Sequence, residues 1–136
     1  MAFLPDYRQQ PVETLLVDPR DIHVVATYST TGPVWTVSTA ARRSHPGSAI
    51  AVAGAGDYDV SGLQKGGAYI VLGCEILPPT GTLTTGIKAN VRAGSIDASA
   101  GTLSIDTRRT DTGALAAPSD ETELHLTIRV EPAVYV

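Results

Sequence analysis

Hydrophobic and polar residues alternate along most of the chain after residue 20. The clearest case is residues 121–130, where Leu124, Leu126, Ile128 and Val130 alternate with polar side chains. Successive side chains of a β-strand point to opposite faces, so this pattern predicts a strand with one buried and one solvated face. The same alternation predicts further strands over residues 102–108, 86–92, 22–29, 34–38, 49–53 and 58–60.

A second apolar stretch is less one-sided. Tyr58, Val60, Ile70 and Leu72 occupy alternate positions on either side of a Gly-rich turn, and we expect all four to face one core. Residues 68–77 are apolar in both phases. This is typical of a central strand covered on both faces, or of a strand whose outer face meets another subunit.

Turn-forming residues divide these segments. Clusters of Gly, Pro, Ser, Thr and Asp recur at intervals of roughly 8 to 12 residues, as in sandwiches and barrels. No segment of residues 21–136 sustains a helical period. The pattern therefore predicts an all-β fold, an antiparallel β-sandwich formed by residues 21–136.

Residues 1–20 differ from the rest. Pro5, Pro11 and Pro19 interrupt this segment and favour extended backbone before each of them, so we interpret it as an extended N-terminal anchoring arm. Its apolar side chains suggest that it contacts its own domain, a neighbouring subunit or a partner. The alternatives are simple packing on its own domain and disorder of the first few residues. The arm residues expected to interact are Phe3, Leu4, Tyr7, Leu15 and Leu16.

Composition narrows the classes of function. The 136 residues are 43% hydrophobic and 18% charged, which fits one globular domain. The 10 basic residues are scattered and the net charge is −4, so we expect no nucleic-acid partner. No signal peptide or membrane-spanning run is apparent, and the single cysteine, Cys74, allows no internal disulfide. These features fit assembly in the cytoplasm.

Three segments carry a resemblance to a known family. GAGDYDVSGL (54–63), SIDTRRTDTGALAAPSD (104–120) and ETELHLTIRV (121–130) are similar to strands and hairpins of the C1q/TNF-like jelly-roll structural proteins of phages. The resemblance covers about residues 49–130. It implies a jelly-roll-like sandwich that forms a homotrimer and acts as a capsid decoration, head spike or fibre component. The implied partners are other virion proteins, such as the major capsid protein, and the implied location is the virion.

The residues do not support an enzyme. His23, His45 and His125 are far apart in the sequence, and none has a second histidine or cysteine at the spacing of a zinc site. There is no G-x-S-x-G nucleophile motif, and Cys74 lies in an apolar segment, where a buried small hydrophobe is expected. We therefore expect no catalytic residues, no metal site and no cofactor.

Two charged clusters were considered as binding sites. Asp57 and Asp59 share one strand face, where a hard cation could be held, but no calcium-binding loop motif is present. Arg42 and Arg43 form the densest basic spot, which could dock on an acidic partner, although a solvated loop is the simpler interpretation.

The sequence thus favours a non-enzymatic virion structural protein that oligomerises through its sandwich and is anchored by its arm. The alternative is a receptor- or carbohydrate-binding module at a tail fibre tip or spike. Trp35 is the one candidate for an aromatic sugar-binding plate, with a core or subunit-interface role as its alternative. Trp35 and Tyr69 complete the set of residues expected to take part in interactions.

Overall fold

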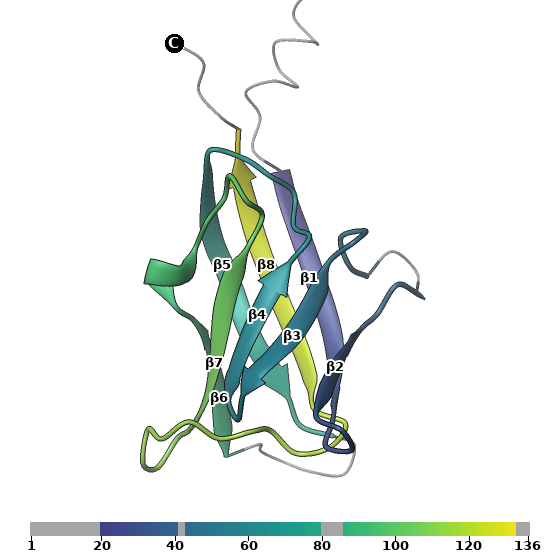
Figure 1. The fold of residues 1–136 in the computed structure, drawn as a ribbon, viewed down its shortest axis with the longest axis vertical. Coiled ribbons are helices and arrows are strands. Elements are labelled where there is room, and N and C mark those ends of the chain that lie inside the picture. The colour runs from purple at the N-terminus through teal and green to yellow at the C-terminus, as the bar shows by residue number, and fades with distance from the viewer. Residues whose placement is uncertain (1–19, 41–42, 80–85, 133–136) are drawn as a thin grey trace, which may run out of the picture.

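The computed structural model describes residues 20–40, 43–79 and 86–132, which form two antiparallel four-stranded sheets packed face to face (Figure 1). The first sheet has the order β2-β1-β8-β5 and the second the order β3-β4-β7-β6. The strands are β1 (Arg20–Ser29), β2 (Val34–Val37), β3 (Ala49–Gly54), β4 (Asp57–Ser61), β5 (Ala68–Leu77), β6 (Ile87–Val91), β7 (Leu103–Arg109) and β8 (Glu123–Glu131). A short 3-10 turn, η2 (Ala93–Ser95), follows β6.

The two C-terminal strands lie in the interior of the sheets. β8 pairs with β1 on one side and β5 on the other, and β7 pairs in the same way with β4 and β6. The chain crosses between the sheets after β2, β4, β5 and β7. This antiparallel arrangement of two packed sheets confirms the prediction of an all-β sandwich.

The core lies between the sheets and is filled mainly by aliphatic side chains. In β8, Leu124, Leu126, Ile128 and Val130 are all buried, as their alternation with polar residues predicts. The other sheet faces them with Tyr58 and Val60 of β4 and with Leu103 and Ile105 of β7.

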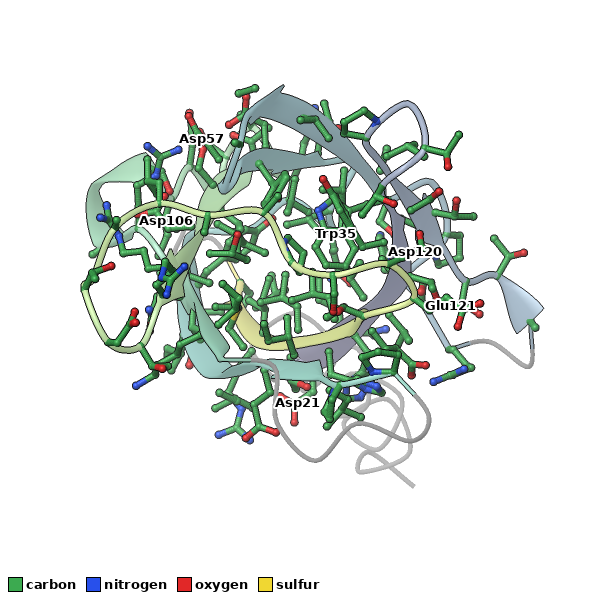
Figure 2. All side chains as sticks on the ribbon, turned by 90° about the horizontal axis from the view of Figure 1, so that it is seen from below. Asp21, Trp35, Asp57, Asp106, Asp120 and Glu121 are labelled. Carbon is green, nitrogen blue, oxygen red and sulfur yellow. The ribbon has the colours of Figure 1, made fainter. Side chains whose placement is uncertain are left out.

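An aromatic cluster closes the core at the lower end of Figure 1. The ring of Trp35 lies 5.0 Å from that of Tyr28 and 5.5 Å from that of Tyr58, measured between centroids. Figure 2, which looks at this end, shows Trp35 between the two sheets.

One part of the strand prediction is wrong. β5 has the predicted bounds, but it is an edge strand of the first sheet rather than a central one. Ile70 and Leu72 are exposed, whereas Tyr69 is buried. A bulge between Val71 and Gly73 changes which residues face the core along this strand. Because the segment is apolar in both phases, its sequence could not reveal which phase is buried.

Candidate functional site: an exposed apolar edge strand

Exposed apolar side chains gather on the edge strands. The described residues expose six large hydrophobic side chains, of which three lie on β5, one on β2, one on β3 and one in the loop after β7. They are Ile70, Leu72, Leu77, Val34, Val52 and Leu115. The edges of the sheets are therefore the most apolar part of the described surface.

We call Ile70, Leu72 and Leu77 of β5 the β5 surface. Each of these side chains keeps close to half of its area exposed, between 46% and 47%. The bulge between Val71 and Gly73 turns Leu72 outward, so that neither half of the strand hides its apolar side chains completely. An edge strand with large exposed hydrophobic residues is a common site for association with another chain.

The outer face of the first sheet next to the β5 surface is polar, and its charged side chains form ion pairs with one another. Arg129 Nε donates to Asp21 Oδ1 at 2.9 Å, and this hydrogen bond holds the pKa of Asp21 below its ordinary value. Glu123 Oε1 lies 2.6 Å from both Arg43 Nη2 and His125 Nε2. The bond from Arg43 lowers the pKa of Glu123. Arg43 is thus engaged within its own chain, and Arg42 lies outside the described residues.

The outer face of the second sheet carries a separate network of charges. Asp106 is buried beneath two arginines, with Arg92 Nε 3.1 Å from Oδ1 and Arg108 Nη2 3.1 Å from Oδ2. Arg92 also pairs with Asp57, and Asp59 accepts a hydrogen bond of 2.7 Å from Ser104 Oγ. Both oxygens of the buried carboxylate are therefore paired with cations, as expected for a structural network.

Asp57 and Asp59 do not form a cation site together, because Asp57 pairs with Arg92 and Asp59 accepts a hydrogen bond from Ser104. Within residues 20–40, 43–79 and 86–132, no group of three or more His, Cys, Asp or Glu side chains is placed to hold a metal ion.

Two of the histidines come together in space although they are distant in the sequence. The His45 backbone N–H donates to the carbonyl of His23 at 2.7 Å, and both residues line an open pocket of about 700 Å³ beside β1. His23 Nδ1 lies 3.2 Å from Thr127 Oγ1. The remaining lining residues are Asp21, Ile22, Thr39, Ser44, Pro46 and Gly47. The carboxylate of Asp21, which also lines the pocket, is paired with Arg129.

Cys74 faces the gap between β5 and β6. It is half-buried and lines a space of about 440 Å³ together with Val71, Ala89 and Val91. Burial raises the pKa of its thiol to about 12, which keeps the sulfur protonated and unreactive at neutral pH.

Two of the residues predicted to interact lie in the described part of the chain, and the others lie outside it. Trp35 and Tyr69 are buried in the core of the chain, with 4% and 9% of their surfaces exposed, and the Tyr69 hydroxyl donates to the Gln64 carbonyl. The burial of Trp35 agrees with the core role that was its alternative, and the part of either residue in interactions stays a prediction. The arm residues lie outside the described residues; they are Phe3, Leu4, Tyr7, Leu15 and Leu16.

The sequence pattern does not predict the β5 surface as a site, because it places two of its residues, Ile70 and Leu72, toward the core. The available signal was the run of apolar residues in both phases over residues 68–77, for which an outer face in contact with another subunit was one of two expectations.

Comparisons with known proteins find no matching family model, no matching curated protein and no matching solved structure. In the part of the chain that the structure describes, no helix is long and apolar enough to cross a membrane.

Proposed function

We propose that this chain is a non-enzymatic structural protein that associates with copies of itself through its β-sandwich. The observation that carries the proposal is the β5 surface, where one edge strand exposes three large hydrophobic side chains along its length. Burial of such side chains stabilises an interface by about 25 cal/mol for each Å² of apolar area removed from water.

The described polar groups support a structural role. Buried Asp106 is fully paired, Cys74 is kept protonated by burial, and the carboxylates of Asp21 and Glu123 are held by arginines. Charged groups used in this way hold strands together and are not poised to transfer protons.

The resemblance of residues 54–63 and 104–130 to phage jelly-roll proteins extends the proposal. In this form the chain is a capsid decoration or head spike component, assembled as a trimer in the host cytoplasm and anchored on other virion proteins by residues 1–20. The sandwich supplies the contact between subunits, and the arm supplies the contact with the particle.

The carbohydrate-binding alternative depended on Trp35 as an exposed aromatic plate. Because that ring packs against Tyr28 and Tyr58 inside the core, no observation on the described residues favours this alternative.

Self-association is tested by sedimentation of the purified full chain over a wide range of concentrations. We expect oligomers that dissociate on dilution, and the substitution Ile70→Ser should raise the dissociation constant about tenfold, as expected for the loss of a buried aliphatic side chain. Leu115→Ser is the comparison and should weaken association less than Ile70→Ser does. Leu115 is exposed to the same extent, at 46% against 47%, but it lies in a loop beside β7 in the other sheet.

A wild-type chain that stays monomeric at every concentration would overturn the proposal. Equal weakening by Ile70→Ser and Leu115→Ser would show that the β5 surface is not the contact.

A further inference from the structure

We infer that copies of this chain associate head to tail, with the β5–β6 side of one copy against the β2–β3 side of the next. The inference rests on the proposed self-association and adds the geometry of the contact. It follows from complementary charges at the two sides of one end of the sandwich, the end at the bottom of Figure 1 and facing the viewer in Figure 2.

One side of this end carries a basic corner, formed by Lys88, Arg108 and Arg109. Lys88 of β6 lies directly opposite Arg108 of β7, an arrangement of like charges that destabilises a sheet when nothing neutralises it. Arg108 pairs with Asp106, and Arg109 pairs with Asp111 at 2.8 Å. Lys88 is exposed, and no carboxylate pairs with it in the described part of the chain.

The opposite side of the same end carries an acidic corner, formed by Asp120 and Glu121. The backbone N–H of Thr30, in the turn between β1 and β2, donates to Asp120 Oδ1 at 2.9 Å, which fixes this corner beside β1. Both residues are exposed, and among the described cations none pairs with either. Figure 2 shows Asp120 and Glu121 on one side and Asp106, the partner of Arg108, on the other.

The backbone holds Glu121 in a strained conformation. Its φ is +64°, a region that L-residues other than Asn and Asp seldom adopt, while its N–H donates to the Tyr28 carbonyl at 2.8 Å. A glycine would relieve this strain, so a glutamate here is consistent with a use for its carboxylate outside the chain.

Apolar residues accompany the charges at the same level of the sandwich. Leu77 of β5 is paired with Glu123 at the start of β8. Glu123 is paired in turn with Thr27 of β1, and Thr27 with Thr36 of β2. Thr36 is two residues from the exposed Val34. A head-to-tail contact therefore brings Leu77 of one copy near Val34 of the next.

The strand directions also agree with this contact. β5 and β2 run antiparallel to each other in the first sheet, and so do β6 and β3 in the second. A copy placed alongside without being turned over thus continues both sheets in antiparallel fashion. A two-fold contact between identical sides would instead place like corners together when its axis runs along the strands, and would set each corner against the opposite end of the sandwich when its axis runs across them. Head-to-tail contacts close into rings when the rotation allows, which is compatible with a trimer.

Charge reversal tests the inference. Lys88→Glu and Glu121→Lys should each raise the dissociation constant of the full chain about tenfold or more in low salt, since each places like charges in the contact. The double variant should return to within about threefold of wild type, because every contact regains one opposite pair. Lys65→Glu is the matched control, because Lys65 is also an exposed lysine but lies far from this end of the sandwich. The N–H of its neighbour Gly66 donates to the carbonyl of Ala98.

A second measurement tests whether the contact joins different sides of two copies or identical sides. In a Cys74→Ala background, Leu77→Cys copies mixed with Val34→Cys copies should form disulfide-linked dimers on mild oxidation, and Leu77→Cys copies alone should not. Dimers from Leu77→Cys alone would overturn the inference in favour of a two-fold contact. Wild-type assembly that survives both charge reversals would also overturn it and leave the β5 surface in place, whereas a monomeric wild type would overturn the proposed function itself.

Discussion

The indole of Trp35 and the ring of Tyr58 meet edge to face, with their planes 86° apart and their centroids separated by 5.5 Å. The contact joins β2 at the edge of the first sheet to β4 in the second. Aromatic pairs in this geometry contribute about 0.5–1.5 kcal/mol beyond the burial of their area. The lower end of the core therefore depends on these rings.

Trp35→Ala should lower the free energy of unfolding by about 3–5 kcal/mol, because it leaves a large cavity between the sheets. Urea unfolding followed by circular dichroism measures this change. Trp35→Phe is the control and should cost less, since it keeps a ring against Tyr28 and Tyr58. A loss below about 1 kcal/mol for Trp35→Ala would contradict the buried position of the indole.

Gly56→Ala should be strongly destabilising, by more than about 2 kcal/mol. Gly56 has a φ of +79°, and a Cβ atom there would lie 2.6 Å from the Thr107 carbonyl oxygen and 2.7 Å from the Ala116 nitrogen. Both are backbone atoms that hydrogen bonds hold in place. Gly32→Ala is the control, because Gly32 has a φ of +55° but an added Cβ meets nothing within 4 Å. It should show only the strain of a left-handed residue, about 1 kcal/mol. Thermal unfolding of both variants decides whether the close approach or the φ angle dominates.

Cys74 should react slowly with thiol reagents in the folded chain at pH 8 and at the rate of a free thiol in urea. Burial raises its pKa from 9.0 to about 12, so the folded chain holds the thiol proton more tightly than the unfolded chain does. The sign of the linkage follows: this contribution to stability is complete below pH 9 and is lost as the pH rises toward 12. Cys74→Ala should remove this part of the alkaline dependence, and identical alkaline unfolding of variant and wild type would count against it.

Deletion of residues 2–17 should leave the sandwich folded and its self-association unchanged, while abolishing incorporation into the particle. The reason is that all the strands of the two described sheets lie at or after Arg20, the first residue of β1. Circular dichroism and sedimentation check the fold and the oligomer, and co-sedimentation with particles checks the anchor. A truncated chain that still sediments with particles would assign anchoring to the sandwich.

Alternation in the sequence was enough to predict seven of the eight described strands, because most of them have one buried and one solvated face, and the apolar run of residues 68–77 predicted the bounds of β5. The prediction for residues 121–130, for example, differs from β8 by only one or two residues at each end. The prediction of the buried face failed for β5, where both phases are apolar and a bulge exchanges them, so that Ile70 and Leu72 face outward. The pairing of Arg92 with Asp57 and Asp106 was equally hidden, since it joins residues from three strands or their ends. Such contacts depend on the order of strands in a sheet, which local patterns do not encode.

The placement of β7 and β8 has a consequence for how the chain matures. Neither sheet can close before these strands arrive, because β1 and β5 touch each other only through β8, and β4 and β6 only through β7. During synthesis, the apolar faces of the six earlier strands stay uncovered until β7 and β8 have left the ribosome. The long-range pairings also predict slow folding for a domain of this size. A truncation before β8 would therefore leave β1 and β5 without the strand that joins them, and would expose apolar side chains on the inner faces of both sheets.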